Sequence, residues 1–123
     1  IAIASISLIV GGIGLFSTLL ISIQERMTEI GIRKSIGATE QDIFFYFIFE
    51  ALALAFIGAV LGVVLAWILI VLIAKGINFP LYLPIQGVAV GILFSLLIGF
   101  LSGIYPAWKA TGIDPIQAIY YRQ

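Results

Sequence analysis

The sequence predicts an all-α membrane protein with three transmembrane helices, a short helix between the first and second spans, and a short amphipathic helix at the C-terminus. Of the 123 residues, 63% are hydrophobic and 10% are charged, whereas soluble proteins average about 45–50% and about 25%. Three uncharged runs are each long enough to cross the hydrocarbon core of a bilayer, which is about 30 Å thick. Seven of the twelve charged residues fall within the charged segment, residues 25–43.

The composition excludes several classes of site. Because the chain contains no Cys and no His, it offers no disulfide, no zinc-finger pattern and no imidazole acid or base. Its six basic residues are scattered, which argues against a nucleic-acid partner, and it lacks the G-x-x-x-x-G-K-[ST] loop that binds nucleotide phosphates. The first residue is Ile rather than Met, so we interpret the chain as a piece of a longer polypeptide.

The three spans are expected at approximately 1–23, 43–74 and 85–106. Residues 1–23 carry no charge, and neither do residues 51–74 or 85–108, so each run satisfies the length of about 20 apolar residues that a transmembrane helix needs. Between the second and third spans, Pro80 and Pro84 predict a turn, with Phe79 and Tyr82 at the membrane interface.

The distribution of basic residues predicts the orientation of the spans. The charged segment and the tail, residues 107–123, together contain Arg26, Arg33, Lys34, Lys109 and Arg122, whereas the turn between spans two and three holds only Lys75. Since Lys and Arg accumulate in cytoplasmic loops, we expect the C-terminus in the cytoplasm and the N-terminus outside it, in a multi-pass protein of the cytoplasmic (inner) membrane.

Small residues at four-residue spacing predict close helix packing in the second and third spans. Such residues let helix backbones approach one another in lipid. The predicted packing residues are Gly58 and Gly62 in span two, and Gly87, Gly91, Ser95, Gly99 and Gly103 in span three. Ala51, Ala55 and Ala59 form a neighbouring stripe in span two. These faces are expected to meet each other or a second protomer; a pore lining or a sliding surface is the alternative.

Glu50 is the one ion close to a span. An ion at the bilayer centre would cost roughly 2.5–3.5 kcal/mol, but Glu50 follows Asp42 by only eight residues and is expected near the interface. We predict a carboxylate that either snorkels to the interface or pairs with Lys109 or Arg33, and a proton-coupling or substrate-contacting role is the alternative.

The charged segment predicts a helix, a glycine break and a second helix start. Over residues 25–36, acids lie in the first turns and bases in the last, as the helix dipole favours; Glu29 and Arg33 also form an i,i+4 pair. Gly37 is expected to stop this helix. Thr39 is then an N-cap with Asp42 at the capping-box position.

The apolar residues of the charged segment lie on both sides of the predicted helix. Met27 and Ile30 are on one side of the charges and Ile32 and Ile36 on the other. A helix lying on a membrane surface would gather its bulky apolar residues on one face, so this mixture suits a protein partner better. A solvated anchoring loop is the alternative.

In the tail, we expect Pro106 to end the third span, with Tyr105 and Trp108 at the interface. Asp114 and Pro115 predict the N-cap and first residue of a short helix. Its apolar face would comprise Ile116, Ile119 and Tyr120.

Two motifs in this sequence resemble the FtsX-like permease domain of MacB- and LolC-type ABC transporters. The first is Glu25-Arg26, Glu29-Ile30-Gly31-Ile32-Arg33, Gly37-Ala38-Thr39, Asp42-Ile43 and Glu50-Ala51. The closing motif is Pro106-Ala107-Trp108-Lys109-Ala110 with Asp114-Pro115-Ile116-Gln117-Ala118. Together the motifs cover nearly the whole chain.

The resemblance implies that this chain holds the last three of four spans, with one span and an extracytoplasmic domain upstream. Residues 25–42 would be the coupling region that docks on a cytoplasmic ATPase subunit or domain, which would hold the ATP and magnesium. Two permease protomers would form the working unit. The implied contact residues are Glu25, Arg26, Glu29, Ile30, Gly31, Arg33, Lys34, Ser35, Gly37 and Ala38.

Three other functions compete with a permease that transmits ATP-driven motion for export. One is a non-transporting transducer of the FtsX type, which regulates extracytoplasmic hydrolases. An ion-coupled secondary transporter would depend on Glu50. An intramembrane enzyme is disfavoured because the chain has no His, no Cys and no G-x-S-x-G motif.

Overall fold

The computed structural model describes residues 2–77 and 84–114, which form four helices. These are α1 (Ala2–Glu25), α2 (Met27–Ser35), α3 (Glu40–Ile77) and α4 (Ile85–Thr111). The helices α1, α3 and α4 contain segments long and apolar enough to cross a membrane, and these ranges contain no strand. The all-α fold with three membrane spans is therefore confirmed.

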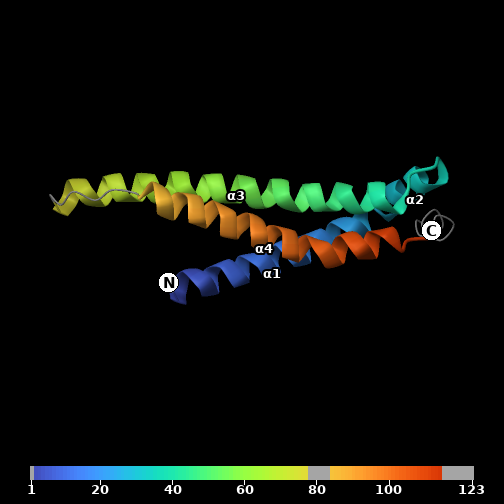
Figure 1. Cartoon of the computed structure of the whole chain (residues 1–123), viewed down its shortest axis with the longest axis horizontal. Helices are drawn as coiled ribbons and strands as arrows, with labels where there is room; N and C mark the ends of the chain where they lie inside the picture. Colours follow the sequence, from blue (N-terminus) through green and yellow to red (C-terminus); the bar gives the residue numbers. More distant parts are fainter. Residues whose placement is uncertain (1, 78–83, 115–123) are drawn as a thin grey trace.

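The helix α4 lies between the other two long helices. It packs extensively on α3 and less extensively on α1, while α1 and α3 scarcely contact each other. Figure 1 shows α3 running the length of the molecule, with α4 crossing it at a shallow angle. The short helix α2 lies at the end where the C-terminal end of α1, the start of α3 and the end of α4 come together (Figure 1).

The buried core is concentrated at this same end. It consists of Ile23, Ile30, Ile43, Phe47, Ile48, Ala107 and Ala110. All four helices contribute to this cluster, so apolar burial is what holds the end near α2 together. Most large apolar side chains elsewhere on α1, α3 and α4 are exposed, as expected for surfaces in contact with lipid or other spans.

Close packing between α3 and α4 uses only some of the small residues. A Cβ on Gly103 would lie 2.7 Å from the Cβ of Ala51, and one on Gly99 would overlap the Cβ of Ala55. The hydroxyl of Ser95 donates a hydrogen bond of 3.2 Å to the carbonyl oxygen of Ala55. The α3–α4 contact is therefore formed by alanines of α3 facing Gly99, Gly103 and Ser95 of α4.

The remaining glycines of the predicted stripes are not in this contact. A Cβ on Gly58, Gly62 or Gly91 would have no neighbour within 4 Å, and one on Gly87 would meet only Pro84, at 3.3 Å. These four glycines line a groove of about 450 Å³ between the outer halves of α3 and α4. The two helices thus diverge beyond Ser95, and the contact on α3 falls on the alanine stripe instead of on Gly58 and Gly62.

Two predicted boundaries are wrong. Pro106 does not end the third helix, because α4 continues to Thr111 with the proline inside it. Pro106 is buried among neighbouring helices, and that packing holds the helix together although the proline lacks the N–H for one helical hydrogen bond. Glu25 is the last residue of α1 rather than part of the short helix, because the chain turns at Arg26. The predicted turn with Phe79 and Tyr82, and the tail helix with Ile116, Ile119 and Tyr120, lie outside the described residues.

Candidate coupling site

The end of α2 is fixed by the glycine break. Gly37 has a φ of +104°, a conformation that residues with a Cβ rarely adopt. Its N–H donates to the carbonyl of Lys34 at 3.1 Å, and the N–H of Ala38 donates to that of Arg33 at 3.0 Å. This pair of bonds is a Schellman motif, and it confirms the prediction that Gly37 stops the short helix.

The start of α3 is fixed by a reciprocal cap. The N–H of Thr39 donates to the Asp42 carboxylate at 2.9 Å, and the N–H of Asp42 donates to the Thr39 hydroxyl at 3.2 Å. The hydroxyl of Thr39 also donates to the same carboxylate, at 2.7 Å. These hydrogen bonds lower the pKa of Asp42 below its ordinary value of 3.8. The predicted capping box is therefore present, in the first turn of α3 ahead of the uncharged residues 51–74.

We expect Thr39→Ala to fray the first turn of α3, because loss of a threonine N-cap costs about 0.5–2 kcal/mol. Hydrogen exchange of the Asp42 and Ile43 amides in the full-length protein should accelerate several-fold. The lowered pKa of Asp42 stabilises the folded state above pH 3.8, and this contribution is lost as pH falls through the pKa of the folded state. In the wild-type protein, the Asp42 and Ile43 amides should therefore stay protected from exchange until the pH falls below 3.8. Gln41→Ala, which changes an exposed residue of the same turn, is the matched control; equal exchange in the two variants would contradict the cap.

Ile30 and Lys34 attach α2 to the core and to α4. Ile30 is 4% exposed and belongs to the core cluster. The ammonium of Lys34 donates to the carbonyl oxygens of Thr111, at 2.5 Å, and Ile113, at 3.0 Å. A cation at this position is favoured because the last carbonyls of a helix lack partners within the helix. Lys34 thus joins α2 to the C-terminal end of α4.

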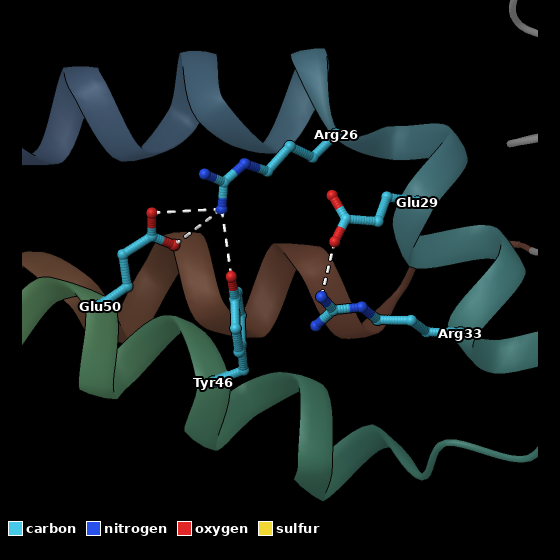
Figure 2. Close-up of polar contacts among 5 residues, drawn as sticks. All are labelled: Arg26, Glu29, Arg33, Tyr46 and Glu50. Atoms are coloured by element: carbon cyan, nitrogen blue, oxygen red, sulfur yellow. Dashed lines mark hydrogen bonds and ion pairs between the residues drawn. The ribbon is translucent and has the colours of Figure 1, made fainter.

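A polar network joins the first residues of the coupling region to α3. The guanidinium of Arg26 donates to the carboxylate of Glu50, with Nη1 lying 3.3 and 3.5 Å from its two oxygens, and to the hydroxyl of Tyr46 at 3.3 Å. Figure 2 shows Tyr46 and Glu50 reaching toward Arg26 from successive turns of α3. The predicted Glu29–Arg33 pair is confirmed at 2.6 Å, and the Arg33 guanidinium lies 4.7 Å from the centre of the Tyr46 ring.

The predicted partner of Glu50 is wrong. The carboxylate pairs with Arg26, while Arg33 is held by Glu29 within α2. The reason is the turn at Arg26 between α1 and α2, which directs this side chain across to α3. Sequence reasoning also missed Tyr46, which contacts both arginines.

The structure separates the predicted ATPase-contact residues by exposure. Glu25, Glu29, Ser35 and Gly37 are exposed, and Arg26, Arg33, Lys34 and Ala38 are half-buried. Ile30 and Gly31 are buried, so they lie on the side of α2 that faces the bundle.

Two large apolar residues outside that set lie on the exposed side of α2 and its end. Ile32 is 50% exposed and Ile36 is 81% exposed. The sequence pattern already placed these two isoleucines, with i,i+4 spacing, on the side of the helix away from Ile30, although the implied contact residues do not include them. The exposed surface of α2 therefore presents Glu29 and Ser35 together with these two isoleucines.

A hollow of about 150 Å³ lies between α2 and the start of α3. Its apolar lining includes Ile30, Ile43 and Phe47, and its charged lining consists of Arg26, Glu29, Arg33 and Asp42. Within residues 2–77 and 84–114, no group of three or more metal-ligating side chains comes together. The arrangement is suited to binding protein side chains.

The model of the FtsX-like permease C-terminal family matches residues 1–115. The chain is 43% identical over 120 residues to the "Uncharacterized ABC transporter permease YknZ" of Bacillus subtilis, covering 98% of this chain and 30% of the relative. It is 42% identical over 118 residues to the "Macrolide export ATP-binding/permease protein MacB" of Campylobacter jejuni, covering 95% and 18%. A MacB protein of Syntrophobacter fumaroxidans is 38% identical over 120 residues, covering 98% and 17%. The chain thus spans less than a third of the length of these relatives.

Proposed function

The chain belongs to the FtsX-like permease family, and on that premise we propose that it passes ATP-driven motion from a cytoplasmic ATPase to an extracytoplasmic domain. It is a permease-type, multi-pass membrane component of the kind found in ABC transporters. In this proposal the described helices contain no transport pathway of their own; they connect a motor on one side of the membrane to a moving part on the other.

The exposed side of α2 is the observation that carries the proposal. The helix is held to the core by Ile30 and to α4 by Lys34, and its opposite side presents Ile32 and Ile36 beside charged groups. An apolar centre with a polar rim is typical of protein–protein contacts. Because α2 is held to the core and to α4, it can transfer the movement of a docked partner to the bundle.

The positions of the charges support the proposed orientation. Arg26, Arg33, Lys34 and Lys109 lie at the end of the bundle that carries α2, whereas Lys75 lies at the opposite end of α3. By the preference of basic residues for the cytoplasm, α2 and the end of α4 are cytoplasmic and the start of α1 is extracytoplasmic. In the proposed orientation, a soluble ATPase can reach α2.

ATP and magnesium would be bound by the partner ATPase, as a fused domain or a separate subunit. Two observations support this division: the chain lacks a phosphate-binding loop, and it corresponds to only 17–18% of relatives whose names include "ATP-binding/permease". In the proposed complex the chain itself is not an enzyme, and a second permease protomer, identical or homologous, completes the unit.

Export is the proposed outcome of the motion. The names of the MacB relatives describe macrolide export, and by similarity we propose efflux or export by the complex that contains this chain. Regulation of extracytoplasmic hydrolases, as an FtsX-type transducer, is the alternative. Cargo accumulation in vesicles that contain the assembled complex distinguishes them, because only an exporter would move cargo.

We expect a single cysteine at Ser35, in an otherwise cysteine-free full-length permease, to cross-link to the ATPase in a nucleotide-dependent manner. Ser35 is exposed at the end of α2, and the described core does not depend on it. A cysteine at Leu72, which is 62% exposed near the other end of α3, is the control and should not cross-link. If the complex assembles but the cysteine at position 35 forms no cross-link to the ATPase, the alternative interpretation of this segment as an anchoring loop is favoured.

A further inference from the structure

We infer that Glu50, together with Arg26 and Tyr46, positions α3 relative to α2, so that a displacement of α2 is passed to α3. This inference rests on the proposed function, because it names the residues through which motion leaves the coupling region. It assigns Glu50 a mechanical role in place of proton coupling or substrate contact.

The geometry makes Arg26 a cross-connection between elements. Arg26 occupies the N-cap position of α2, directly after α1. From there its Nη1 reaches both carboxylate oxygens of Glu50 and the hydroxyl of Tyr46, at 3.3–3.5 Å. Because Tyr46 and Glu50 are four residues apart, they lie on one face of α3. One guanidinium therefore holds two successive turns of α3 (Figure 2).

A second contact from α2 reinforces this connection. The guanidinium of Arg33, fixed by Glu29, lies 4.7 Å from the centre of the Tyr46 ring, within the distance at which a cation is attracted to an aromatic face. Tyr46 is thus contacted by Arg26 at the start of α2 and by Arg33 near its end. Rotation of α2 relative to α3 would have to break one of these contacts.

Among the described residues, the surrounding packing provides few other routes from α2 to α3. The helices α1 and α3 scarcely touch, and Lys34 leads from α2 to α4 instead. The covalent link between α2 and α3 is a short turn that contains Gly37. Ile30 packs in the common core, where apolar contacts are non-directional. The two arginines, in contrast, make directional contacts to α3.

The position of Glu50 along α3 strengthens the ion pair. The 24 uncharged residues from 51 to 74 correspond to about 36 Å of helix, which is enough to fill the hydrocarbon core. Glu50 therefore lies at the edge of that core, where its side chain is 24% exposed and that of Arg26 is 39% exposed. An ion that loses its partner in such a setting is left poorly solvated, which favours keeping the pair closed.

The test uses the full-length permease with its ATPase, reconstituted in liposomes. Spin labels on cysteines at Ile6 of α1 and Leu72 of α3, both exposed, report the separation of these helices away from α2, and ATP should change that distance. In Glu50→Gln, we expect at least half of the change to be lost while the Ser35 cross-link to the ATPase remains. The charge exchange, Arg26→Glu with Glu50→Arg, should restore most of it.

Glu40→Gln is the matched control. It makes the same chemical change on α3 at an exposed residue that forms no ion pair with any other described residue, and it should leave the distance change intact. A full distance change in Glu50→Gln, or failure of the charge exchange to restore it in a folded complex, would overturn the inference. If the permease with a cysteine at position 35 and an unchanged Glu50 forms no cross-link to the ATPase, the proposed function itself is overturned. The two failures are therefore distinguishable.

Discussion

Replacing Gly37 by valine is expected to leave ATP hydrolysis running in the full-length complex while the movement of α3 is lost. The φ of Gly37 is +104°, and a β-branched residue held there is strained by about 1–3 kcal/mol. Space is not the limit, because a Cβ at this position would have no neighbour within 4 Å. The strain is relieved when the Schellman motif opens, which changes the angle between α2 and α3.

The measurement combines ATPase activity with the distance between labels at Ile6 and Leu72. For Gly37→Val we expect most of the nucleotide-dependent change in distance to be lost, because a strain of about 1.4 kcal/mol shifts the equilibrium between two arrangements of α2 and α3 about tenfold. Gly37→Asn is the control, since asparagine adopts positive φ more readily than other residues with a Cβ, and it should behave nearly as wild type. A valine variant with an unaltered distance change would show that the glycine break does not set the position of α2.

Gly99→Val should be the most destabilising substitution in the bundle. The added Cβ would overlap that of Ala55 and lie 3.4 Å from the carbonyl oxygen of Ala51, so α3 and α4 must separate. Overpacking of this kind costs about 1–3 kcal/mol, and more where backbone is involved. Separation would also break the hydrogen bond from Ser95 to Ala55, and we expect a melting temperature several degrees lower.

Gly91→Val is the matched control for this experiment. It lies on the same stripe of α4, two turns away, but no atom lies within 4 Å of its missing Cβ, so the melting temperature should change little. A compensating pair sharpens the test: Ala55→Gly should recover most of the stability lost in Gly99→Ala, because it removes the methyl group that Gly99 faces. Equal destabilisation by valine at positions 91 and 99 would contradict the observed contact between α3 and α4.

Local chemistry is what made much of this fold predictable. Uncharged runs of about 24 residues are explained by the thickness of a bilayer whatever surrounds them, so α1, α3 and α4 could be located without a structure. The stop at Gly37 and the cap formed by Thr39 and Asp42 involve residues only a few positions apart. The Glu29–Arg33 pair spans one helical turn and was predictable for the same reason.

Features that depend on how the helices are placed were not predictable. The partner of Glu50 is 24 positions away, and its identity depends on the turn at Arg26. Seven small residues of α3 and α4 fit a pattern typical of close packing. The angle between the two helices determines that α3 covers Gly99 and Gly103 but not Gly91. Pro106 read alone indicates a helix end, and its neighbours in the bundle override that tendency.

The length of α3 has a mechanical consequence. It is one unbroken helix of 38 residues, or about 57 Å, that starts at the turn after α2 and extends past the far end of its uncharged run. Treated as a stiff lever pivoting near its cytoplasmic end, it would convert a tilt of only about 5° into a displacement of about 5 Å at its other end. Small angular adjustments beside α2 would therefore be amplified across the bilayer without stretching or unwinding the helix.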